Sequence, residues 1–332
     1  MKKILILLAL PLLFNSCLKD DEDKFSKSAT ERIEEAVKEA ITVLQGAENG
    51  WRMEVYSESE RIYGGYTLFL KFNADNTVVA SSENFAAGKT ESSYYSVVAE
   101  SGPVLAFDTN NDIIHFYSSP TTGAELGIGT SNGGLEGDSD FIVMEASADF
   151  VKLKGRKTNN YAYLYPIEAG VNWKTELQSY QDAAAKMDLI YTRCVVDGVA
   201  YPIDWEMRLN NFSSRVFRIS YTPAPGDDGS VSAGEVVKAP FVFTETGLKF
   251  YSPLTIGNAT VSEMTFKEDY YFENEDGSVK IYSPKPVRSN NKLTINPADI
   301  TFSSATVNVT PSVATDYYYF DVYAVSYTHL TL

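Results

Sequence analysis

One cysteine near the start of the chain stands where its thiol could be modified covalently. Cys17 follows Lys2-Lys3, an apolar run over Ile4–Phe14 and then Asn15-Ser16. This order is typical of a bacterial lipoprotein export signal, in which cleavage before the cysteine leaves its thiol and amine to carry acyl chains. The apolar run would span roughly 16 Å as a helix, about half of a hydrocarbon core. We therefore expect residues 1–16 to be a signal peptide and Cys17 to be the lipid anchor; the alternative is a soluble secreted protein cleaved near Asn15 or Ser16.

Charged residues directly after Cys17 could act as a localisation signal. Lys19, Asp20, Asp21 and Glu22 resemble the acidic signal that sends lipoproteins of the Bacteroidota to the outer face of the outer membrane. The alternative, compatible with the first, is a solvated acidic tether, because charge runs are usually solvated. The sequence thus predicts a lipid-anchored protein of the outer membrane that faces the cell exterior, with residues 17–27 as its tether.

The glycine-rich segment from Ser119 to Asp140 contains a sequence motif that occurs in hydrolases. Gly129-Thr-Ser131-Asn-Gly133 matches the nucleophile elbow, which needs a strand before it, a helix after it and a histidine later in the chain. We expect neither element here, and the later histidine is His329, in a tail that we interpret as foreign. The sequence therefore argues against hydrolase chemistry at Ser131. Loops of this length are usually functional or disordered.

Two sets of polar residues have spacings that could hold a cation. Asp108, Asn110 and Asp112 match the first ligands of a calcium loop, but Ile113 stands where glycine is required, so we expect a hairpin turn there. Glu136, Asp138 and Asp140 could hold calcium weakly, the alternative being a solvated loop. A catalytic zinc site commonly uses histidines, and we expect His115 instead to pack or hydrogen-bond within its strand. We predict no metal site and no cofactor, and we assign no catalytic residue.

The charge balance excludes one class of partner. Removal of residues 1–16 leaves 26 Lys plus Arg against 44 Asp plus Glu, so the net charge becomes −18. An acidic surface repels phosphate backbones, and we expect no nucleic-acid binding. Cys194 has no cysteine partner once Cys17 is lipidated, and we expect a buried, inert thiol in a strand. The 22 Tyr and 18 Phe could form a sugar-stacking platform, although core packing is the default for aromatics at strand positions.

Hydrophobic periodicity predicts two helices, each followed by an antiparallel meander. The first helix runs from about Ala29 to Gln45, with a capping box at Ser28 and Glu31 and with Gly46 to close it. The second helix runs from about Trp173 to Met187. Strands are expected in the first half at 51–56, 66–72, 77–81, 94–98, 104–107, 113–117, 141–145, 151–155 and 162–166. Hairpin turns are expected in the second half at Asp197-Gly198, Thr246-Gly247 and Asp276-Gly277.

The predicted fold class is α+β, mainly antiparallel β, with two similar helix-plus-meander units. Two local echoes suggest the duplication: Pro103–Thr109 followed by His115–Pro120, and Pro240–Thr246 followed by Lys249–Pro253. The expected domains are 28–168 and 172–284 for the two units, and 285–325 for the start of an immunoglobulin-like β-sandwich that is truncated. We interpret residues 326–332 as a non-native tail and expect the natural chain to be longer.

Several motifs of the first unit carry a resemblance to a known family. They are Ala47-Glu-Asn-Gly-Trp51, Gly64-Gly-Tyr66, Leu70-Lys-Phe-Asn73, Gly102-Pro-Val-Leu-Ala-Phe-Asp108 and Gly137-Asp-Ser-Asp-Phe141. With the lipoprotein signal, they resemble a Bacteroidota lipoprotein family known as domain of unknown function 4302. The resemblance implies an accessory role beside an uptake system made of a TonB-dependent channel and its lipoprotein lid. It supplies no catalytic residues.

Two functions from different classes remain open on the sequence. The leading hypothesis is a non-catalytic, surface-anchored protein that binds a ligand or a partner and assists nutrient uptake; a purely structural subunit of that complex is not separable from it. The alternative is a surface hydrolase of polysaccharide or peptide that uses a carboxylate pair. The identity of the ligand is open in both cases.

Overall fold

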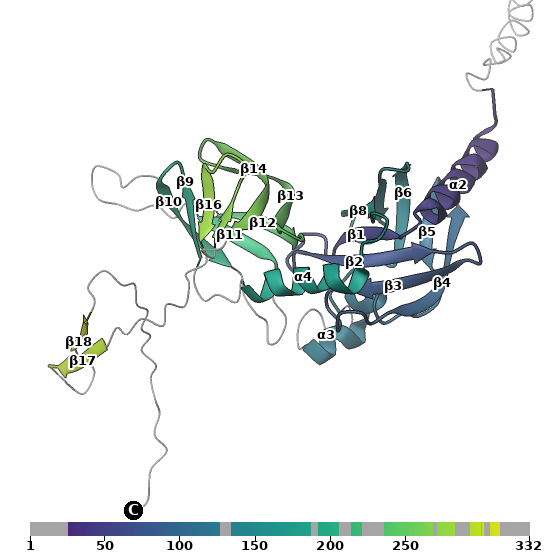
Figure 1. Ribbon diagram of the computed structural model, residues 1–332. Helices are drawn as coiled ribbons and strands as arrows, with labels where there is room; N and C mark the ends of the chain where they lie inside the picture. Colours follow the sequence, from purple (N-terminus) through teal and green to yellow (C-terminus); the bar gives the residue numbers. More distant parts are fainter. Residues whose placement is uncertain are drawn as a thin grey trace, which may run out of the picture. The chain divides into compact units, whose positions relative to one another are not determined.

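Two closed β-barrels account for most of the residues that the computed structural model describes (Figure 1). These residues are 26–126, 134–186, 192–205, 214–220, 236–267, 271–282, 293–299, 301 and 306–312. Both barrels belong to one compact unit, which ends at Ser283, and the residues from Pro284 onward form a second unit. The chain is mostly antiparallel β-structure, as the sequence predicts.

The first barrel is an eight-stranded meander in which every strand pairs with its neighbours in sequence. Its strands are β1 (Trp51–Tyr56), β2 (Gly65–Phe72), β3 (Thr77–Ser82), β4 (Glu91–Ala99), β5 (Pro103–Phe107), β6 (Asp140–Ala146), β7 (Val151–Gly155) and β8 (Tyr161–Pro166). Closure comes from β1, in which Trp51 pairs with Leu70 of β2 on one side and with Pro166 of β8 on the other. Alternate residues of these strands point inward and fill the first core.

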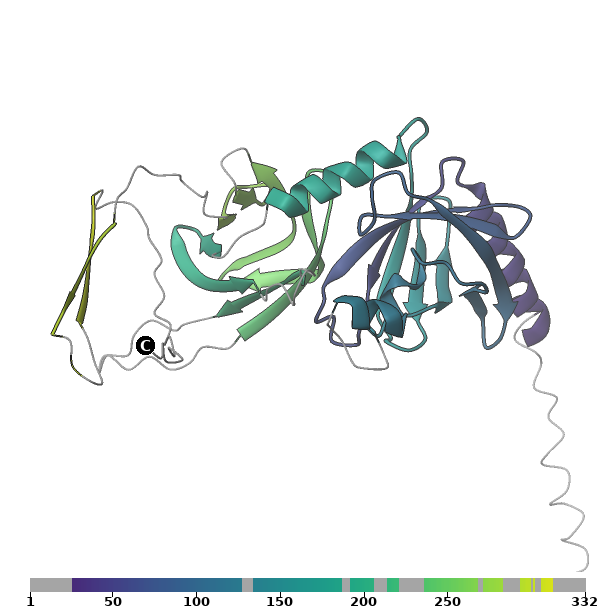
Figure 2. The same cartoon turned by 90° about the horizontal axis from the view of Figure 1, so that it is seen from below.

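Helix α2 (Ala29–Gly46) packs against β4, β5 and β6 of this barrel (Figure 2). It starts as predicted, because Ser28 and Glu31 form a reciprocal capping box. Its end differs from the prediction: Gly46 is still helical, and Ala47 follows in an extended conformation. The helix end is held instead by Trp51, whose indole N–H donates to the Leu44 carbonyl at 2.8 Å.

The strand predicted at 113–117 is wrong, because these residues form a turn and a 3₁₀ helix, η2 (His115–Tyr117). The cause is Asn111, whose side-chain oxygen accepts hydrogen bonds from the backbone N–H groups of Ile113 and Ile114, both at 3.1 Å. A side chain that caps consecutive N–H groups turns the backbone away from strand geometry. A short helix, α3 (Pro120–Leu126), follows within the segment that was expected to be irregular.

The second barrel repeats the meander order and is also closed. Its strands are β9 (Thr192–Val196), β10 (Val199–Trp205), β11 (Val216–Ser220), β12 (Val236–Phe243), β13 (Gly247–Ile256), β14 (Ala259–Lys267), β15 (Tyr271–Glu273) and β16 (Val279–Tyr282). Cys194 of β9 pairs with Tyr201 of β10 and with Ile281 of β16, which closes the ring. The three predicted hairpin turns lie between β9 and β10, β12 and β13, and β15 and β16.

Helix α4 (Trp173–Lys186) contributes to both barrels. Its buried residues Leu177 and Tyr180 belong to the second core, together with Phe69 of β2. The Phe69 ring meets Trp173 and Tyr180 edge-on, at centroid distances of 5.5 and 6.2 Å. On the other side, Gln181 donates to the carbonyls of Glu83 and Phe85, which follow β3. The helix therefore ties the second core to the outer surface of the first barrel.

A buried ion pair joins the two barrels beside this helix. Arg215, directly before β11, donates to both carboxylate oxygens of Glu83 at 2.7 and 2.9 Å, and to the Gly65 carbonyl at 3.1 Å. The Arg215 guanidinium also lies over the rings of Tyr66 and Phe243. Burial alone would lower the pKa of Arg215, but the Glu83 carboxylate outweighs burial and raises it. Arg215 therefore keeps its charge and links β11 of the second barrel to the residues around β2 and β3 of the first.

The second unit contains a two-stranded antiparallel sheet, β17 (Leu293–Ala298) and β18 (Thr306–Pro311). Leu293 pairs with Pro311 and Ala298 with Thr306, so the register is continuous along both strands.

Candidate functional site

Most residues that the sequence singled out for covalent chemistry lie outside the described part of the chain. These are the lipid-anchor candidate Cys17, the export-signal residues Lys19, Asp20, Asp21 and Glu22, the elbow serine Ser131 and the tail histidine His329. Cys194 is described, and it is fully buried in β9. The prediction of a buried thiol in a strand is confirmed, and burial raises the pKa of this thiol to about 12, as expected for an unreactive cysteine.

The candidate calcium residues of the glycine-rich segment serve different purposes in the fold. Asp138 is only 7% exposed, and its Oδ1 accepts hydrogen bonds from the backbone N–H groups of Lys157 at 2.6 Å and Thr158 at 3.2 Å. Its Oδ2 accepts a hydrogen bond from the Thr158 hydroxyl group. Glu136 takes a positive φ of 58°, and Asp140 begins β6. Asp138 therefore holds the turn between β7 and β8. Within the described ranges, no three His, Cys, Asp or Glu side chains are placed to hold a metal ion.

The residues from Asp108 to His115 form hydrogen bonds with one another and with strand β4. Asp108 accepts from the Ser96 hydroxyl at 3.0 Å, and Asn110 donates to Asp112 at 3.0 Å. The ring Nδ1 of His115 lies 3.1 Å from both the backbone N and the carbonyl O of Asn111. The hairpin turn predicted here is wrong, because β5 leads into η2 and α3 and the next strand begins only at Asp140.

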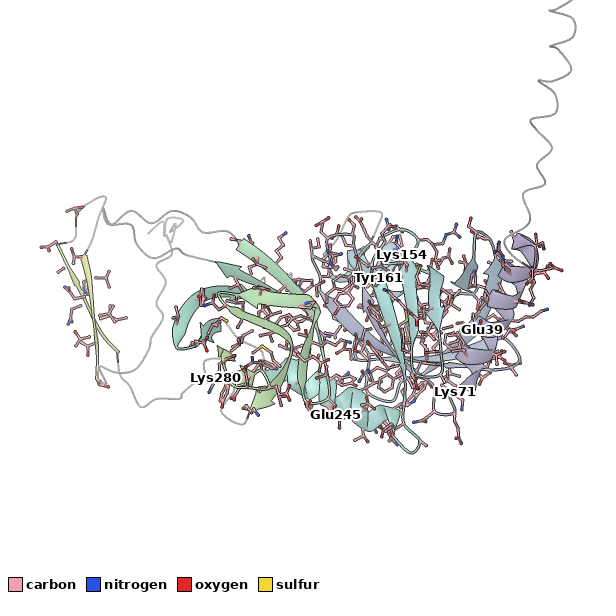
Figure 3. The ribbon with its side chains drawn as sticks, turned by 90° about the horizontal axis from the view of Figure 1, so that it is seen from above. Glu39, Lys71, Lys154, Tyr161, Glu245 and Lys280 are labelled. Carbon is pink, nitrogen blue, oxygen red and sulfur yellow. The ribbon has the colours of Figure 1, made fainter. Side chains whose placement is uncertain are left out.

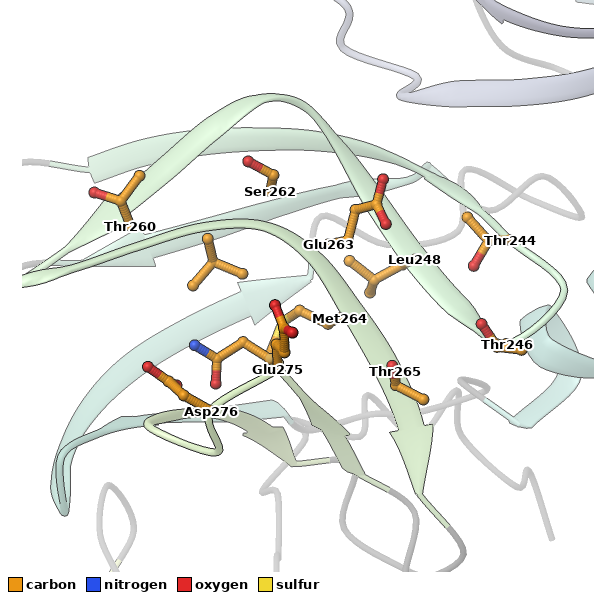
Figure 4. Close-up of a pocket in the computed structure, with 12 residues that line it drawn as sticks. Thr244, Thr246, Leu248, Thr260, Ser262, Glu263, Met264, Thr265, Glu275 and Asp276 are labelled. Atoms are coloured by element: carbon orange, nitrogen blue, oxygen red, sulfur yellow. The ribbon is translucent and has the colours of Figure 1, made fainter. Parts of the chain in front are cut away.

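A hollow of about 820 Å³ on the second barrel is the site that the structure adds (Figure 4). It lies along β14, between the turn that leads into β13 and the turn that joins β15 to β16. Its lining is rich in hydroxyl and other polar side chains. The residues that line it are Thr244, Thr246, Leu248, Thr260, Val261, Ser262, Glu263, Met264, Thr265, Asn274, Glu275 and Asp276. We call this set the β14 hollow.

The walls of the β14 hollow are stiff and negatively charged. Four of its residues are threonines, whose branched side chains have few rotamers when they lie on strands. Asp276 accepts hydrogen bonds from the backbone N–H and the hydroxyl of Ser278, at 2.9 and 2.6 Å. The hydroxyl and the N–H of Ser278 lower the pKa of Asp276. Asp276 is therefore a carboxylate near neutral pH and accepts hydrogen bonds.

Sequence reasoning found two edges of this hollow, the hairpin turns predicted at Thr246-Gly247 and Asp276-Gly277. The Asp276-Gly277 pair was recognised as a turn signal, and Gly277 has the positive φ, 75°, that such a turn needs. The threonines and Glu263 carry no motif, because they come from two separate segments, the turn before β13 and strand β14, which the pairing of β13 with β14 brings together. Alternation of polar and apolar residues along β14 was the available signal.

Comparison with known proteins gives a family without an assigned activity. The family model described as "Domain of unknown function (DUF4302)" matches residues 21–268, about three quarters of the chain. A search of curated proteins found no match. Among the described helices, none is both long and apolar enough to cross a membrane. On the family match, the chain is a member of the DUF4302 family.

Proposed function

We propose that this protein is a surface-exposed outer-membrane lipoprotein that binds a ligand without converting it, as an accessory of a nutrient-uptake system. The observation that carries the binding role is the β14 hollow. Its volume of about 820 Å³ falls within the usual size of small-molecule sites, roughly 300–1,000 Å³. Its lining of hydroxyl, amide and carboxylate groups fits a ligand that is itself rich in hydroxyl groups, and a neutral oligosaccharide is the proposed ligand class.

The electrostatics of the hollow favour a neutral ligand over an acidic one. Glu263, Glu275 and Asp276 lie within it, and the chain has a net charge of −16. An anionic ligand would meet repulsion there, whereas sugar hydroxyls can donate hydrogen bonds to these carboxylates.

Attachment to the membrane is proposed from the sequence. Cys17 is the proposed lipid anchor, and Lys19, Asp20, Asp21 and Glu22 the proposed export signal. Several acyl chains on one residue give stable anchoring, since a single chain binds only marginally. The proposed partners are a TonB-dependent channel and its lipoprotein lid. Protease added to intact cells should degrade the protein; protection that is lost only on lysis would contradict surface display.

We also propose that the two barrels are copies of one unit and that β17 and β18 begin an immunoglobulin-like sandwich. The support for duplication is architectural: each barrel is a helix followed by eight strands in the same order. The sequence echoes do not support it, because they fall on elements that differ. Pro103–Phe107 is a fifth strand, but Pro240 lies in a fourth strand; His115–Tyr117 is a 3₁₀ helix, but Lys249 lies in β13.

The alternative of a hydrolase with a carboxylate pair also centres on the hollow, because Glu263 and Glu275 both line it. Such a mechanism needs one carboxyl group that is protonated and acts as the acid. Asp276 is unsuited to that role, because its hydrogen bonds from Ser278 lower its pKa. Binding is therefore the better-supported function.

Titration calorimetry with neutral malto-, xylo- and chito-oligosaccharides tests the binding role. We expect Ser262→Ala and Glu263→Gln each to weaken binding about three- to tenfold, which corresponds to the loss of one hydrogen bond. Ser92→Ala on β4 and Glu145→Gln on β6 are matched controls, because both are exposed strand residues on the first barrel. If the control variants weaken binding as much as the hollow variants do, the hollow is not the site. Release of reducing ends by the wild-type protein would favour the hydrolase.

A further inference from the structure

Three tyrosines of β8 lie in a row on the outer side of the first barrel. Tyr161, Tyr163 and Tyr165 are half-buried, and they alternate with Ala162 and Leu164, which belong to the first core. Because successive strand residues point to opposite faces, the three tyrosines share the outer face. The rings of Tyr163 and Tyr165 are nearly parallel, with an interplanar angle of 19° and centroids 6.4 Å apart. Each of the three residues is partly exposed to solvent, and the Tyr165 ring is also contacted by Lys249 and Arg52.

Two lysines of β7 flank this row. Lys152 pairs in register with Tyr163, and Lys154 with Tyr161; Figure 3 shows Lys154 beside Tyr161. The Lys152 ammonium lies 4.3 Å from the centroid of the Tyr161 ring and 5.9 Å from that of Tyr163. We call Tyr161, Tyr163, Tyr165, Lys152 and Lys154 the tyrosine–lysine face.

In the described part of the chain, the two lysines of this face form no ion pair with a carboxylate. This includes Glu145 of β6, which is the register partner of Lys152. At the other end of the row the charges are paired: Lys249 of β13 and Arg52 of β1 both contact the Glu54 carboxylate, at 2.9 and 3.8 Å. Two ammonium groups without an ion-pair partner among the described residues thus lie beside aromatic rings, in a chain with a net charge of −16.

We propose that the tyrosine–lysine face binds an acidic polysaccharide, with sugar rings against the tyrosines and uronate carboxylates at Lys152 and Lys154. Sugar rings present C–H groups that pack on aromatic faces, and the phenol hydroxyls add polar contacts at the ring ends. Ammonium–carboxylate hydrogen bonds are among the stronger polar contacts, and they select for an anionic chain. An overall acidic protein needs such a local positive patch to hold a polyanion.

The topology favours a glycan over an acidic peptide as the occupant. β7 is hydrogen-bonded to β6 and β8, and β8 to β7 and β1. Neither strand has a free edge, so a peptide cannot extend the sheet by adding a strand. The site shares no residue with the β14 hollow, and the proposal does not depend on what that hollow binds.

Titration calorimetry of the full chain in detergent tests the proposal, with tetragalacturonate as the probe. Its methyl ester has the same sugar rings without the charge, and poly-L-glutamate has the charge without sugar rings. We expect Lys152→Gln/Lys154→Gln to weaken tetragalacturonate binding about tenfold or more, since each exposed ion pair contributes up to about fivefold. We expect Tyr161→Ala to weaken it about tenfold through lost ring contact.

Two control variants match these changes on other surfaces. Tyr94→Ala removes a tyrosine of β4 that is 56% exposed, and Lys38→Gln removes an exposed lysine of α2; both should bind as the wild type does. An unchanged thermal unfolding midpoint shows that a variant is folded. The proposal is overturned if the wild type does not bind tetragalacturonate, if the methyl ester binds equally well, if poly-L-glutamate binds equally well, or if the control variants lose as much affinity as the face variants.

Discussion

Removing either partner of the buried ion pair between Arg215 and Glu83 should destabilise the protein strongly, and removing both should not. Arg215→Met keeps an apolar stem against Tyr66 and Phe243. It leaves the Glu83 carboxylate, whose side chain is 0% exposed, with the Thr67 N–H at 2.6 Å as its remaining donor among the described residues. Breaking a buried pair from one side costs about 3–5 kcal/mol. Glu83→Gln should cost a similar amount, since it leaves a guanidinium, 7% exposed, without its counter-charge.

The double variant Arg215→Met/Glu83→Gln separates the loss of the pair from the cost of an unpaired charge. Both charges are then absent, and the glutamine can still accept from Thr67. Neutral replacement of a buried pair is often close to neutral in stability, so we expect a total cost of about 0–2 kcal/mol and a coupling energy of at least about 4 kcal/mol.

Urea unfolding, monitored by tryptophan fluorescence, measures these values. Trp51 lies in the first core, and Trp173 packs against the second core. Free energies come from the midpoint and slope of each transition. The reasoning is refuted if either single variant costs less than about 1 kcal/mol, or if the double variant costs the sum of the two single variants.

Three further predictions concern single positions. Asp138→Ala should cost about 2–4 kcal/mol in urea unfolding, because the buried N–H and hydroxyl of Thr158 and the part-buried N–H of Lys157 lose their acceptor. Asp140→Ala should stay within about 0.5 kcal/mol; equal costs would contradict the turn-holding role. Gly64→Ala should cost more than about 2 kcal/mol of stability, because Gly64 has a φ of 73° and a Cβ there would lie 2.2 Å from the Arg215 carbonyl oxygen. Gly46→Ala, on the open surface of helix α2, should stabilise the protein. Cys194 should resist iodoacetamide at pH 8 until urea unfolds the chain, because its folded pKa of about 12 keeps it a thiol. Any stability that comes from this raised pKa is fully present below the ordinary value near 9 and is lost as the pH rises through 12. Fast labelling of the native protein would contradict burial.

Local features of this fold were readable from the sequence. The capping box at Ser28 and Glu31 fixes the start of α2, and the alternation of Val151–Gly155 gives β7 its bounds. These signals succeed because capping and alternation depend on residues close together in the chain. The strand prediction for residues 113–117 failed because apolar alternation was the signal used. The side chain of Asn111 instead accepts hydrogen bonds from two consecutive N–H groups and turns the backbone.

Closure and the candidate sites depend on contacts that the sequence does not encode locally. Nothing near Trp51 indicates that it pairs with Pro166 as well as with Leu70, so an open meander and a closed barrel have the same local pattern. The β14 hollow and the tyrosine–lysine face combine side chains from neighbouring strands and turns of the meanders. The hollow groups threonines of β14 with those of the turn before β13, and the alternation along β8 places its tyrosines on the outer face, where a core position was the default expectation.

The position of Phe69 has a consequence for how the chain is made. Phe69 lies on the outside of the first barrel and is fully buried only because Trp173 and Tyr180 cover it. Synthesis of the 104 residues from Phe69 to Trp173 takes roughly 5–20 s at ordinary rates of elongation. Strand β8, which closes the first barrel, ends at Pro166, so every strand of that barrel is made before Trp173 and Tyr180, which cover this ring. The first barrel can thus act as a nucleus on which the second half of the chain assembles. Until then, the uncovered Phe69 ring is an exposed apolar site that a chaperone would bind.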